Sequence, residues 1–207
     1  MNIEFSSHEL RDLAIAWIAL SIAFAIFFAG GGQRAIFLLG SGQFGLALLV
    51  SLLTAGVAFL LHEVAHKVVA IRFGQVAEFR ADYGMLGVAI MSALVGFIFA
   101  APGAVYHRGM LTEREHGLIA LAGPAMNLAL VVVFVPIFLA GLVLNSGIVE
   151  LVGSRGLVIN AFLAAFNMLP IASLDGRTVI SWSKTVFAGV FALSAALTVL
   201  LVLFVGI

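Results

Sequence analysis

Apolar residues dominate this chain and gather into long runs that short polar connections separate. Six such runs have the approximate limits Leu13–Ala29, Phe44–Ile71, Met85–Ala101, Gly117–Leu144, Leu157–Ile171 and Trp182–Gly206. Most of them approach the ~20 residues that an α-helix needs to cross a bilayer. The pattern therefore predicts an all-α polytopic membrane protein with about five to six transmembrane segments.

The composition supports this class of protein. Of the 207 residues, 63% are hydrophobic and 10% are charged, against about 25% charged residues in a typical soluble domain. Because the chain is so apolar, we expect contact with membrane lipid. Basic and acidic residues balance, so we expect no nucleic-acid partner. The absence of cysteine excludes disulfides and thiolate metal ligands. We expect one membrane-embedded domain over residues 1–207, with its core at about 44–184.

The third apolar run does not fit a simple crossing of the membrane. If Met85–Tyr106 enters the membrane and returns to the same side, only Arg34 and Arg155 lie outside, whereas a full crossing divides the basic residues evenly. The positive-inside rule favours the uneven arrangement. We therefore predict a re-entrant or short β element here, with a chain break at Ala101–Ala104. The polar stretch Glu78–Asp82 before it is interpreted as an interfacial loop.

Two histidines and a glutamate interrupt the second run in the pattern H-E-x-x-H, as His62, Glu63 and His66. On a helix, histidines four residues apart share one face, where they can bind zinc while the carboxylate acts as a general base. An ionisable residue at the centre of a span costs about 2.5–3.5 kcal/mol, so this group needs a compensating partner such as a metal ion. The alternative is a solvated helix face, but apolar residues follow again at Val68–Ile71.

A catalytic zinc ion usually has three protein ligands and one open position. The polar connections offer several candidates for the third ligand, namely His8, Asp82, His107, His116 and Asp175. Asp175 follows Pro170, where an apolar run breaks, and precedes a glycine that permits a tight bend. The alternative for Asp175 is an ordinary cap at the start of the next helix.

Taken together, these segments resemble the site-2 protease family of intramembrane zinc metalloproteases, in its short archaeal or bacterial form without a PDZ or CBS domain. That family pairs an H-E-x-x-H helix with a distant N-x-x-P-x-x-x-x-D-G segment, and this sequence has His62–His66 and Asn167–Gly176 in the same order. Ala122–Asn127 is similar to the family's G-P-x-x-N stretch, and Phe99–Tyr106 looks like its membrane-associated strand. The resemblance covers about Phe44 to Lys184.

The resemblance implies a zinc metalloendopeptidase with one catalytic Zn²⁺ ion. The implied zinc ligands are His62, His66 and Asp175, and the implied catalytic base is Glu63. The implied reaction is hydrolysis of peptide bonds within or near transmembrane segments of membrane protein substrates, known as regulated intramembrane proteolysis. The count of basic residues places Asp175 on the inner side. We therefore expect a multi-pass protein of the cell membrane with its active site nearer the cytoplasmic side.

The resemblance also implies roles for three further residues. Asn167 matches a family asparagine that contacts substrate or stabilises the reacting carbonyl, so it is a catalytic and substrate-binding candidate. Asn127 and Pro170 are further substrate-binding candidates. For both asparagines the alternative is a hydrogen bond between helices, worth about 1–2 kcal/mol at most.

Two functions of other classes compete with proteolysis. The first is a catalytically silent membrane homologue that keeps the metal and only binds transmembrane partners. Glu63 argues against it, because a silent site has no need of that carboxylate. The second is a zinc transporter, which predicts polar residues along a pathway, whereas this sequence shows one cluster in an apolar interior.

Overall fold

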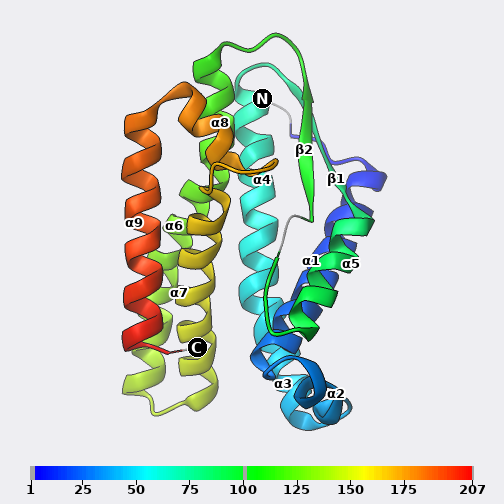
Figure 1. Ribbon diagram of the computed structural model, residues 1–207, viewed down its shortest axis with the longest axis vertical. Coiled ribbons are helices and arrows are strands. Elements are labelled where there is room, and N and C mark those ends of the chain that lie inside the picture. The colour runs from blue at the N-terminus through cyan, green and yellow to red at the C-terminus, as the bar shows by residue number, and fades with distance from the viewer. Residues whose placement is uncertain (1–2, 100–101, 207) are drawn as a thin grey trace. The chain divides into compact units, whose positions relative to one another are not determined.

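The computed structural model describes residues 3–99 and 102–206 of the chain. In this part, five helical segments are long and apolar enough to cross a membrane, namely Ser7–Phe28, Gly42–Arg72, Glu113–Val143, Gly147–Asn167 and Lys184–Phe204 (Figure 1). The prediction of an all-α polytopic membrane protein is confirmed. The first helix begins earlier than its apolar run, because the Ser6 side chain accepts a hydrogen bond from the Glu9 N–H and caps it.

The third apolar run does not form a span, and the predicted short β element is present. Helix α5, Tyr83–Leu94, has 12 residues, well short of the ~20 that a span requires. Strand β2, Gly103–Arg108, follows and pairs with β1, Val76–Ala81. The interpretation of Glu78–Asp82 as a loop is wrong for most of its length, because β1 runs through it. Of the predicted chain break, Ala101 lies outside the described residues.

Glycine begins β2 for a steric reason. Gly103 has a φ of +156°, and a Cβ at this position would lie 2.3 Å from the Arg80 carbonyl oxygen. A larger residue would therefore push β2 away from β1 at the point where the sheet begins.

Contacts divide the described chain into two compact units. The first unit comprises residues 3–4, 61–77 and 107–206, and the second comprises residues 5–60, 78–99 and 102–106. Helix α4, Val57–Arg72, contributes its first turn to the second unit and the rest, from Leu61 onward, to the first. Both histidines of the H-E-x-x-H pattern therefore belong to the first unit.

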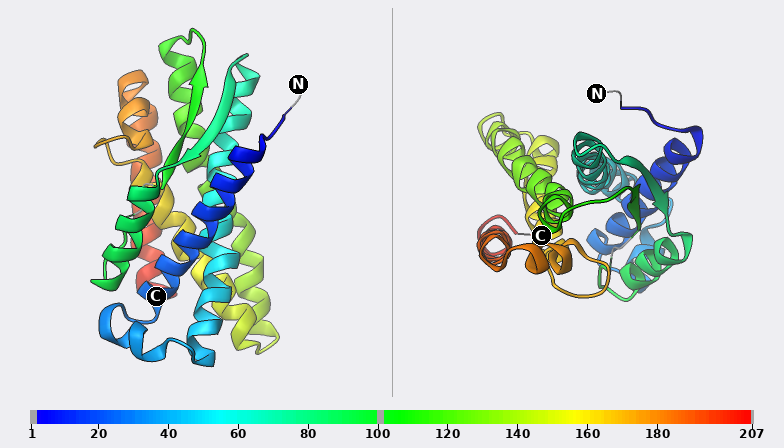
Figure 2. Two further views of the ribbon diagram at one scale, coloured as in Figure 1. Left: turned by 90° about the vertical axis from the view of Figure 1, so that its right-hand side faces the viewer. Right: turned by 90° about the horizontal axis from the view of Figure 1, so that it is seen from above.

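The first unit is built on α6, Glu113–Val143, and α7, Gly147–Asn167, which run side by side (Figure 2). Small residues permit this close packing, as is common between membrane helices. A Cβ at Gly153 would lie 2.4 Å from the Phe138 backbone, and one at Gly156 would lie 2.1 Å from the Phe134 ring. Helix α8, Asp175–Trp182, packs on α6, and α9, Lys184–Phe204, packs on α7 and α8.

The second unit is built on α1, Ser7–Phe28, which contacts α3, Gly42–Ser51, and α5. A π-helical turn, Leu52–Gly56, joins α3 to α4, and its Leu52 carbonyl accepts a hydrogen bond from Trp17 Nε1 at 3.2 Å. The short helix α2, Gly32–Leu38, contacts α5. The unit thus packs around the first helix, which also reaches β1 through the acidic side chains of Glu9 and Asp12.

Candidate metal centre

The three side chains that the sequence suggests as zinc ligands converge within the first unit. His62 and His66 project from one face of α4, and Asp175 is the first residue of α8. The two Nε2 atoms are 2.9 Å apart. The Oδ2 atom of Asp175 lies 3.3 Å from Nε2 of His62 and 3.4 Å from Nε2 of His66. Both histidines are buried, and the Asp175 side chain is 17% exposed.

In each of the two histidines, Nδ1 lies within hydrogen-bond distance of an oxygen that accepts. His66 Nδ1 lies 2.7 Å from the Ile119 carbonyl oxygen, and a carbonyl can only accept, so this Nδ1 carries the proton. His62 Nδ1 lies 2.6 Å from Asn127 Oδ1. A neutral imidazole protonated at Nδ1 has its lone pair on Nε2. Two nitrogen lone pairs and a carboxylate oxygen therefore face one another, which requires a cation between them.

These residues fit a zinc ion. Asp175 Oδ2 is buried and accepts no hydrogen bond from the described residues, an arrangement that is costly unless a cation satisfies it. Tetrahedral zinc with bonds of about 2.0–2.2 Å separates its ligand atoms by about 3.3–3.6 Å. The two distances to Asp175 agree with this spacing, while the distance between the nitrogens would have to widen slightly. Two imidazoles and one carboxylate leave a fourth position open, as in catalytic zinc sites.

Helix α6 approaches the imidazoles at Gly123. A Cβ at this position would lie 2.4 Å from Nε2 of both His62 and His66. The missing side chain leaves space beside the atoms that would hold the metal. Within the stretch Ala122–Asn127, the glycine at position 123 is therefore explained by its place against the two histidines.

The position of Asp175 depends on how the chain turns between α7 and α8. A Cβ at Gly176 would lie 2.0 Å from the Met168 carbonyl oxygen, so only glycine allows this close approach. Val179 then packs in a buried cluster with Ala120 and Met168, which holds α8 on α6. The alternative of a capping role for Asp175 is contradicted, because the N-cap residue of α8 is Leu174.

The electrostatic environment keeps Asp175 ionised. Burial by itself raises the pKa of this carboxyl group, but positive charge on the imidazoles of His66 and His62 outweighs burial and lowers the pKa to about 2. A metal cation held by neutral imidazoles would act in the same direction. The carboxylate is therefore charged at neutral pH and available as a ligand.

The other predicted site residues occupy different positions. Glu63 is buried next to His62 on α4. Asn167 ends α7 and donates a hydrogen bond from Nδ2 to the Leu163 carbonyl of its own helix, at 3.0 Å. Pro170 is exposed in the turn that follows. Asn167 and Pro170 thus lie on the connection that leads to Asp175, and their roles toward a substrate stay predictions.

Asn127 contacts the centre directly, and it has a partner that sequence reasoning missed. Its Nδ2 donates a hydrogen bond to Asn160 Oδ1 on α7, at 3.1 Å, and both side chains are completely buried. The available signal was the position of Asn160, which is an amide inside an apolar run. Polar residues within membrane segments usually face the bundle interior and pair with one another.

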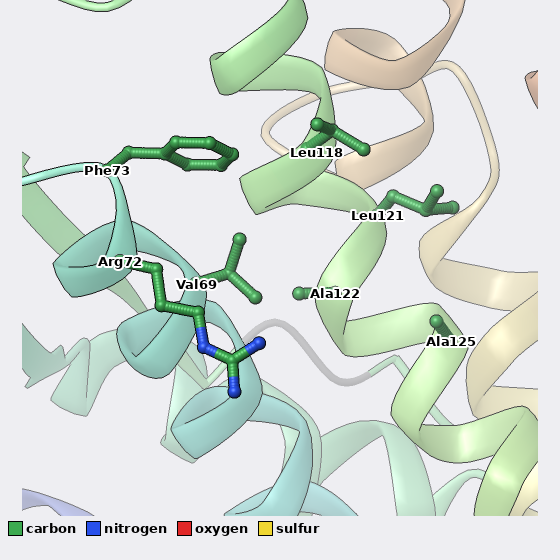
Figure 3. Close-up of a pocket in the computed structure, with 7 residues that line it drawn as sticks. All are labelled: Val69, Arg72, Phe73, Leu118, Leu121, Ala122 and Ala125. Atoms are coloured by element: carbon green, nitrogen blue, oxygen red, sulfur yellow. The ribbon is translucent and has the colours of Figure 1, made fainter.

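An apolar groove of about 340 Å³ lies between the end of α4 and α6. It is lined by Val69, Arg72, Phe73, Leu118, Leu121, Ala122 and Ala125. Figure 3 shows Val69 and Ala122 pointing toward one another across the groove, with Phe73 facing Leu118. Because Ala122 directly precedes Gly123, the wall of the groove continues along α6 into the metal centre.

Comparison with known proteins identifies similar chains. This chain is 38% identical over 188 residues to a protein of Methanocaldococcus jannaschii named as a putative zinc metalloprotease, and 89% of each chain is covered. A protein of the same description from Bacillus subtilis is 32% identical over 148 residues, 62% of this chain and 66% of that protein. Another from Mycobacterium tuberculosis is 35% identical over 202 residues, which are 92% of this chain but only 45% of that protein. No family model and no solved structure matches the chain.

Proposed function

We propose that this chain, which belongs to the zinc metalloprotease family of the Methanocaldococcus jannaschii protein, is an intramembrane protease. Family membership confirms the predicted resemblance and the predicted zinc cofactor. The proposed reaction is hydrolysis of peptide bonds within or near transmembrane segments of other membrane proteins. It is an instance of regulated intramembrane proteolysis, as the site-2 protease resemblance implies.

The location of the metal centre carries this proposal. His62 and His66 lie on a candidate span of 31 residues, Gly42–Arg72, and Ile119 and Asn127, which bond to them, lie on a second candidate span. A protease with its reactive group among membrane helices is best placed for substrates that are themselves in the membrane. This supports transmembrane proteins as the substrate class.

The chain's own residues have distinct roles in the proposed reaction. We assign the ligand role to His62, His66 and Asp175, whose free ligand atoms converge. Zinc, when bound, supplies a Lewis acid that polarises a carbonyl and makes water a nucleophile near neutral pH. Glu63 takes a proton from the attacking water and delivers it to the leaving amine. Its burial beside the ligands supports this role.

Asn167 and Pro170 complete the proposed substrate site. An amide N–H aimed at a developing oxyanion stabilises it strongly where water is excluded. Asn167 is half-buried at the end of α7, on the connection that leads to Asp175, and this position supports a substrate role. Asn127 is the third predicted substrate contact, although its described hydrogen bonds run to His62 and Asn160.

We also propose that the centre lies nearer the cytoplasmic side of a multi-pass membrane protein. Arg177 and Lys184 follow Asp175 closely and belong to the basic residues that the positive-inside rule assigns to the cytoplasm. Labelling of a cysteine introduced at Lys184 by an impermeant reagent from outside intact cells would contradict this orientation.

The test of the proposed function uses the purified chain in liposomes with a reporter protein that carries one transmembrane helix. Glu63→Gln should lower cleavage by about 10²–10⁴-fold, since it removes the base, while bound zinc stays unchanged. Glu113→Gln is the matched control, because Glu113 is exposed at the start of α6. Cleavage should stop with a chelator and return with zinc.

Several outcomes would reject the proposal. Cleavage at the wild-type rate by Glu63→Gln would remove the base assignment. Cuts mapped only to soluble regions distant from the transmembrane helix would reject the intramembrane substrate class. Zinc flux into the liposomes without any cleavage would support a transporter instead.

A further inference from the structure

We propose that Asn160 is a positioning residue of the metal centre, which acts through Asn127 to hold His62 in its metal-binding form. This inference rests on the proposed function in one respect, namely that His62 is a zinc ligand. Asn160 itself lies on α7, on the far side of Asn127 from His62, and its described hydrogen bonds run to Asn127 and Gly156. Its effect on the metal would therefore be indirect.

The three side chains form one directed series of hydrogen bonds. Asn160 Nδ2 donates to the Gly156 carbonyl oxygen at 2.9 Å. Asn127 Nδ2 donates to Asn160 Oδ1 at 3.1 Å, and Asn127 Oδ1 lies 2.6 Å from His62 Nδ1. The series connects three helices, α7, α6 and α4.

A backbone group determines the direction of the whole series. The Gly156 carbonyl can only accept, so the end of the Asn160 amide that faces it must be the NH₂ group. The Oδ1 of Asn160 therefore faces Asn127 and accepts from its NH₂ group, which leaves Asn127 Oδ1 toward His62. An acceptor at this position requires a proton on His62 Nδ1 and leaves the lone pair on Nε2.

Without Asn160, the Asn127 amide loses the acceptor that fixes its direction in this series. A rotation by half a turn would present its NH₂ group to His62 Nδ1, which would then have to accept. The proton of the neutral imidazole would move to Nε2, the atom that lies 2.9 Å from His66 Nε2 and 3.3 Å from Asp175. A proton there blocks the position that the metal must occupy, so the rotated amide opposes zinc binding.

The two histidines differ in how the proton on Nδ1 is fixed. His66 Nδ1 meets the Ile119 backbone carbonyl directly, and a backbone carbonyl cannot rotate within a helix. His62 reaches its backbone carbonyl, that of Gly156, only through two side-chain amides. Asn127 and Asn160 are both completely buried, so water cannot substitute for a lost partner without a cavity. The His62 half of the centre is therefore the half that substitutions on α7 can disturb.

The competing explanation is that Asn160 only holds α6 and α7 together. Hydrogen bonds between membrane helices are worth about 0.6 kcal/mol on average and about 1–2 kcal/mol at most. Such a role predicts lower thermal stability for a variant and an unchanged zinc affinity of the folded protein. Zinc affinity therefore separates the two explanations.

The experiment measures zinc affinity of the full-length, folded protein in detergent by competition with a coloured chelator. Asn160→Leu, similar in size but without polar atoms, should weaken zinc binding by about 10–100-fold, the usual effect of losing an outer partner of a ligand histidine. Ser194→Ala is the matched control. Ser194 is equally buried in the first unit, and its hydroxyl bonds only carbonyls of its own helix α9, so its removal should leave affinity unchanged.

A double-mutant cycle tests whether Asn160 acts through Asn127. In an Asn127→Leu background, Asn160→Leu should cause almost no further loss of zinc affinity, because no amide remains to be oriented. Losses that add in the double variant would overturn the proposal, as would wild-type affinity in Asn160→Leu.

A spectroscopic measurement follows the tautomer without depending on activity. In the metal-free wild-type protein, ¹⁵N NMR of selectively labelled histidine should show His62 protonated at Nδ1, and Asn160→Leu should add the form protonated at Nε2. An unchanged tautomer in a folded Asn160→Leu protein would overturn the proposal. If this variant does not fold, a wild-type His62 that is protonated at Nε2 would overturn it as well.

The outcomes for the proposed function are separate. A wild-type protein that binds zinc but cleaves no transmembrane substrate would reject proteolysis and leave the role of Asn160 standing. A wild-type protein that cleaves as proposed, with an Asn160→Leu variant of unchanged zinc affinity, would reject the role of Asn160 alone.

Discussion

Buried carboxylates in the two units are satisfied in opposite ways. In the second unit, Asp12 accepts a hydrogen bond from the Tyr83 hydroxyl at 2.7 Å and another from the Ala81 N–H at 3.2 Å. It also forms an ion pair with the exposed Arg11 guanidinium at 3.1 Å. Glu9, on the same helix α1, accepts from the Phe79 N–H at 3.0 Å. In the first unit, Asp175 Oδ2 accepts from no donor and faces two imidazole nitrogens.

This difference separates a structural carboxylate from a metal ligand. By sequence alone, an acidic residue in or beside a membrane helix is a candidate for function. The donors around such residues distinguish the cases, because a carboxylate surrounded by N–H and O–H groups is already stabilised by hydrogen bonds. A carboxylate that faces only lone pairs requires a cation. Asp12 and Glu9 therefore hold β1 against α1, whereas Asp175 is fitted to a metal.

The largest difference should appear when one carboxylate in each unit becomes an amide. Asp175→Asn removes the ligand charge and should weaken zinc binding by more than about 100-fold, beyond the about 10–100-fold effect of outer partners. Asp12→Asn should leave zinc affinity unchanged and lower the melting temperature, because its NH₂ group would replace an oxygen that accepts from either Ala81 or Tyr83, and the ion pair with Arg11 would be lost. Chelator competition and thermal melting of both variants measure the two effects.

The opposite result would contradict this distinction between the two carboxylates. If Asp175→Asn kept its zinc, or if Asp12→Asn lost it while folded, the donor pattern would not identify the metal ligand.

The next effect concerns space at the metal centre. Gly123→Ala adds a Cβ that would lie 2.4 Å from both Nε2 atoms. Overpacking typically costs about 1–3 kcal/mol, so zinc affinity should fall by about 5–150-fold. The control is Gly189→Ala on α9, where an added Cβ meets no atom within 4 Å. Equal zinc affinity in the two variants would show that α6 does not limit the space beside the imidazoles.

A third, smaller effect belongs to the second unit. Glu9→Leu removes the acceptor of the Phe79 N–H, and a buried donor without a partner costs about 1–3 kcal/mol. The variant should melt at a lower temperature than the wild type and bind zinc with unchanged affinity. A stability equal to that of the wild type would mean that Glu9 does not hold β1.

The smallest effect is expected for Tyr83→Phe, which removes one donor to Asp12. The hydrogen bond to Asp12 raises the pKa of the Tyr83 phenol. A raised pKa means that the bond stabilises the fold below the unfolded pKa of about 10 and that this stability is lost as pH rises through the folded value. Wild type and variant should therefore differ slightly in melting temperature at pH 7 and converge in alkaline buffer. A difference that grows with pH would contradict the bond.

Strand β1 is a feature that the sequence did not predict. Its residues Glu78 and Arg80 are polar and suggested a loop, but the N–H groups of Phe79 and Ala81 bond to acidic residues of α1 about 70 positions earlier in the chain. Asn160 escaped for a related reason, because nothing in its own segment shows that an amide of α6 lies against it. Both features depend on partners that are remote in sequence.

By itself, the sequence determined the membrane class, the presence of about five to six apolar segments and the chemistry of the ligand types. These follow from local patterns: the length of an apolar run sets a span, and a spacing of four residues puts His62 and His66 on one helical face. Only the tertiary structure decided which buried carboxylate lacks a donor, and which amides determine the tautomer of His62. Those properties belong to contacts between separate helices, where the direction of each hydrogen bond depends on the groups that packing brings opposite one another.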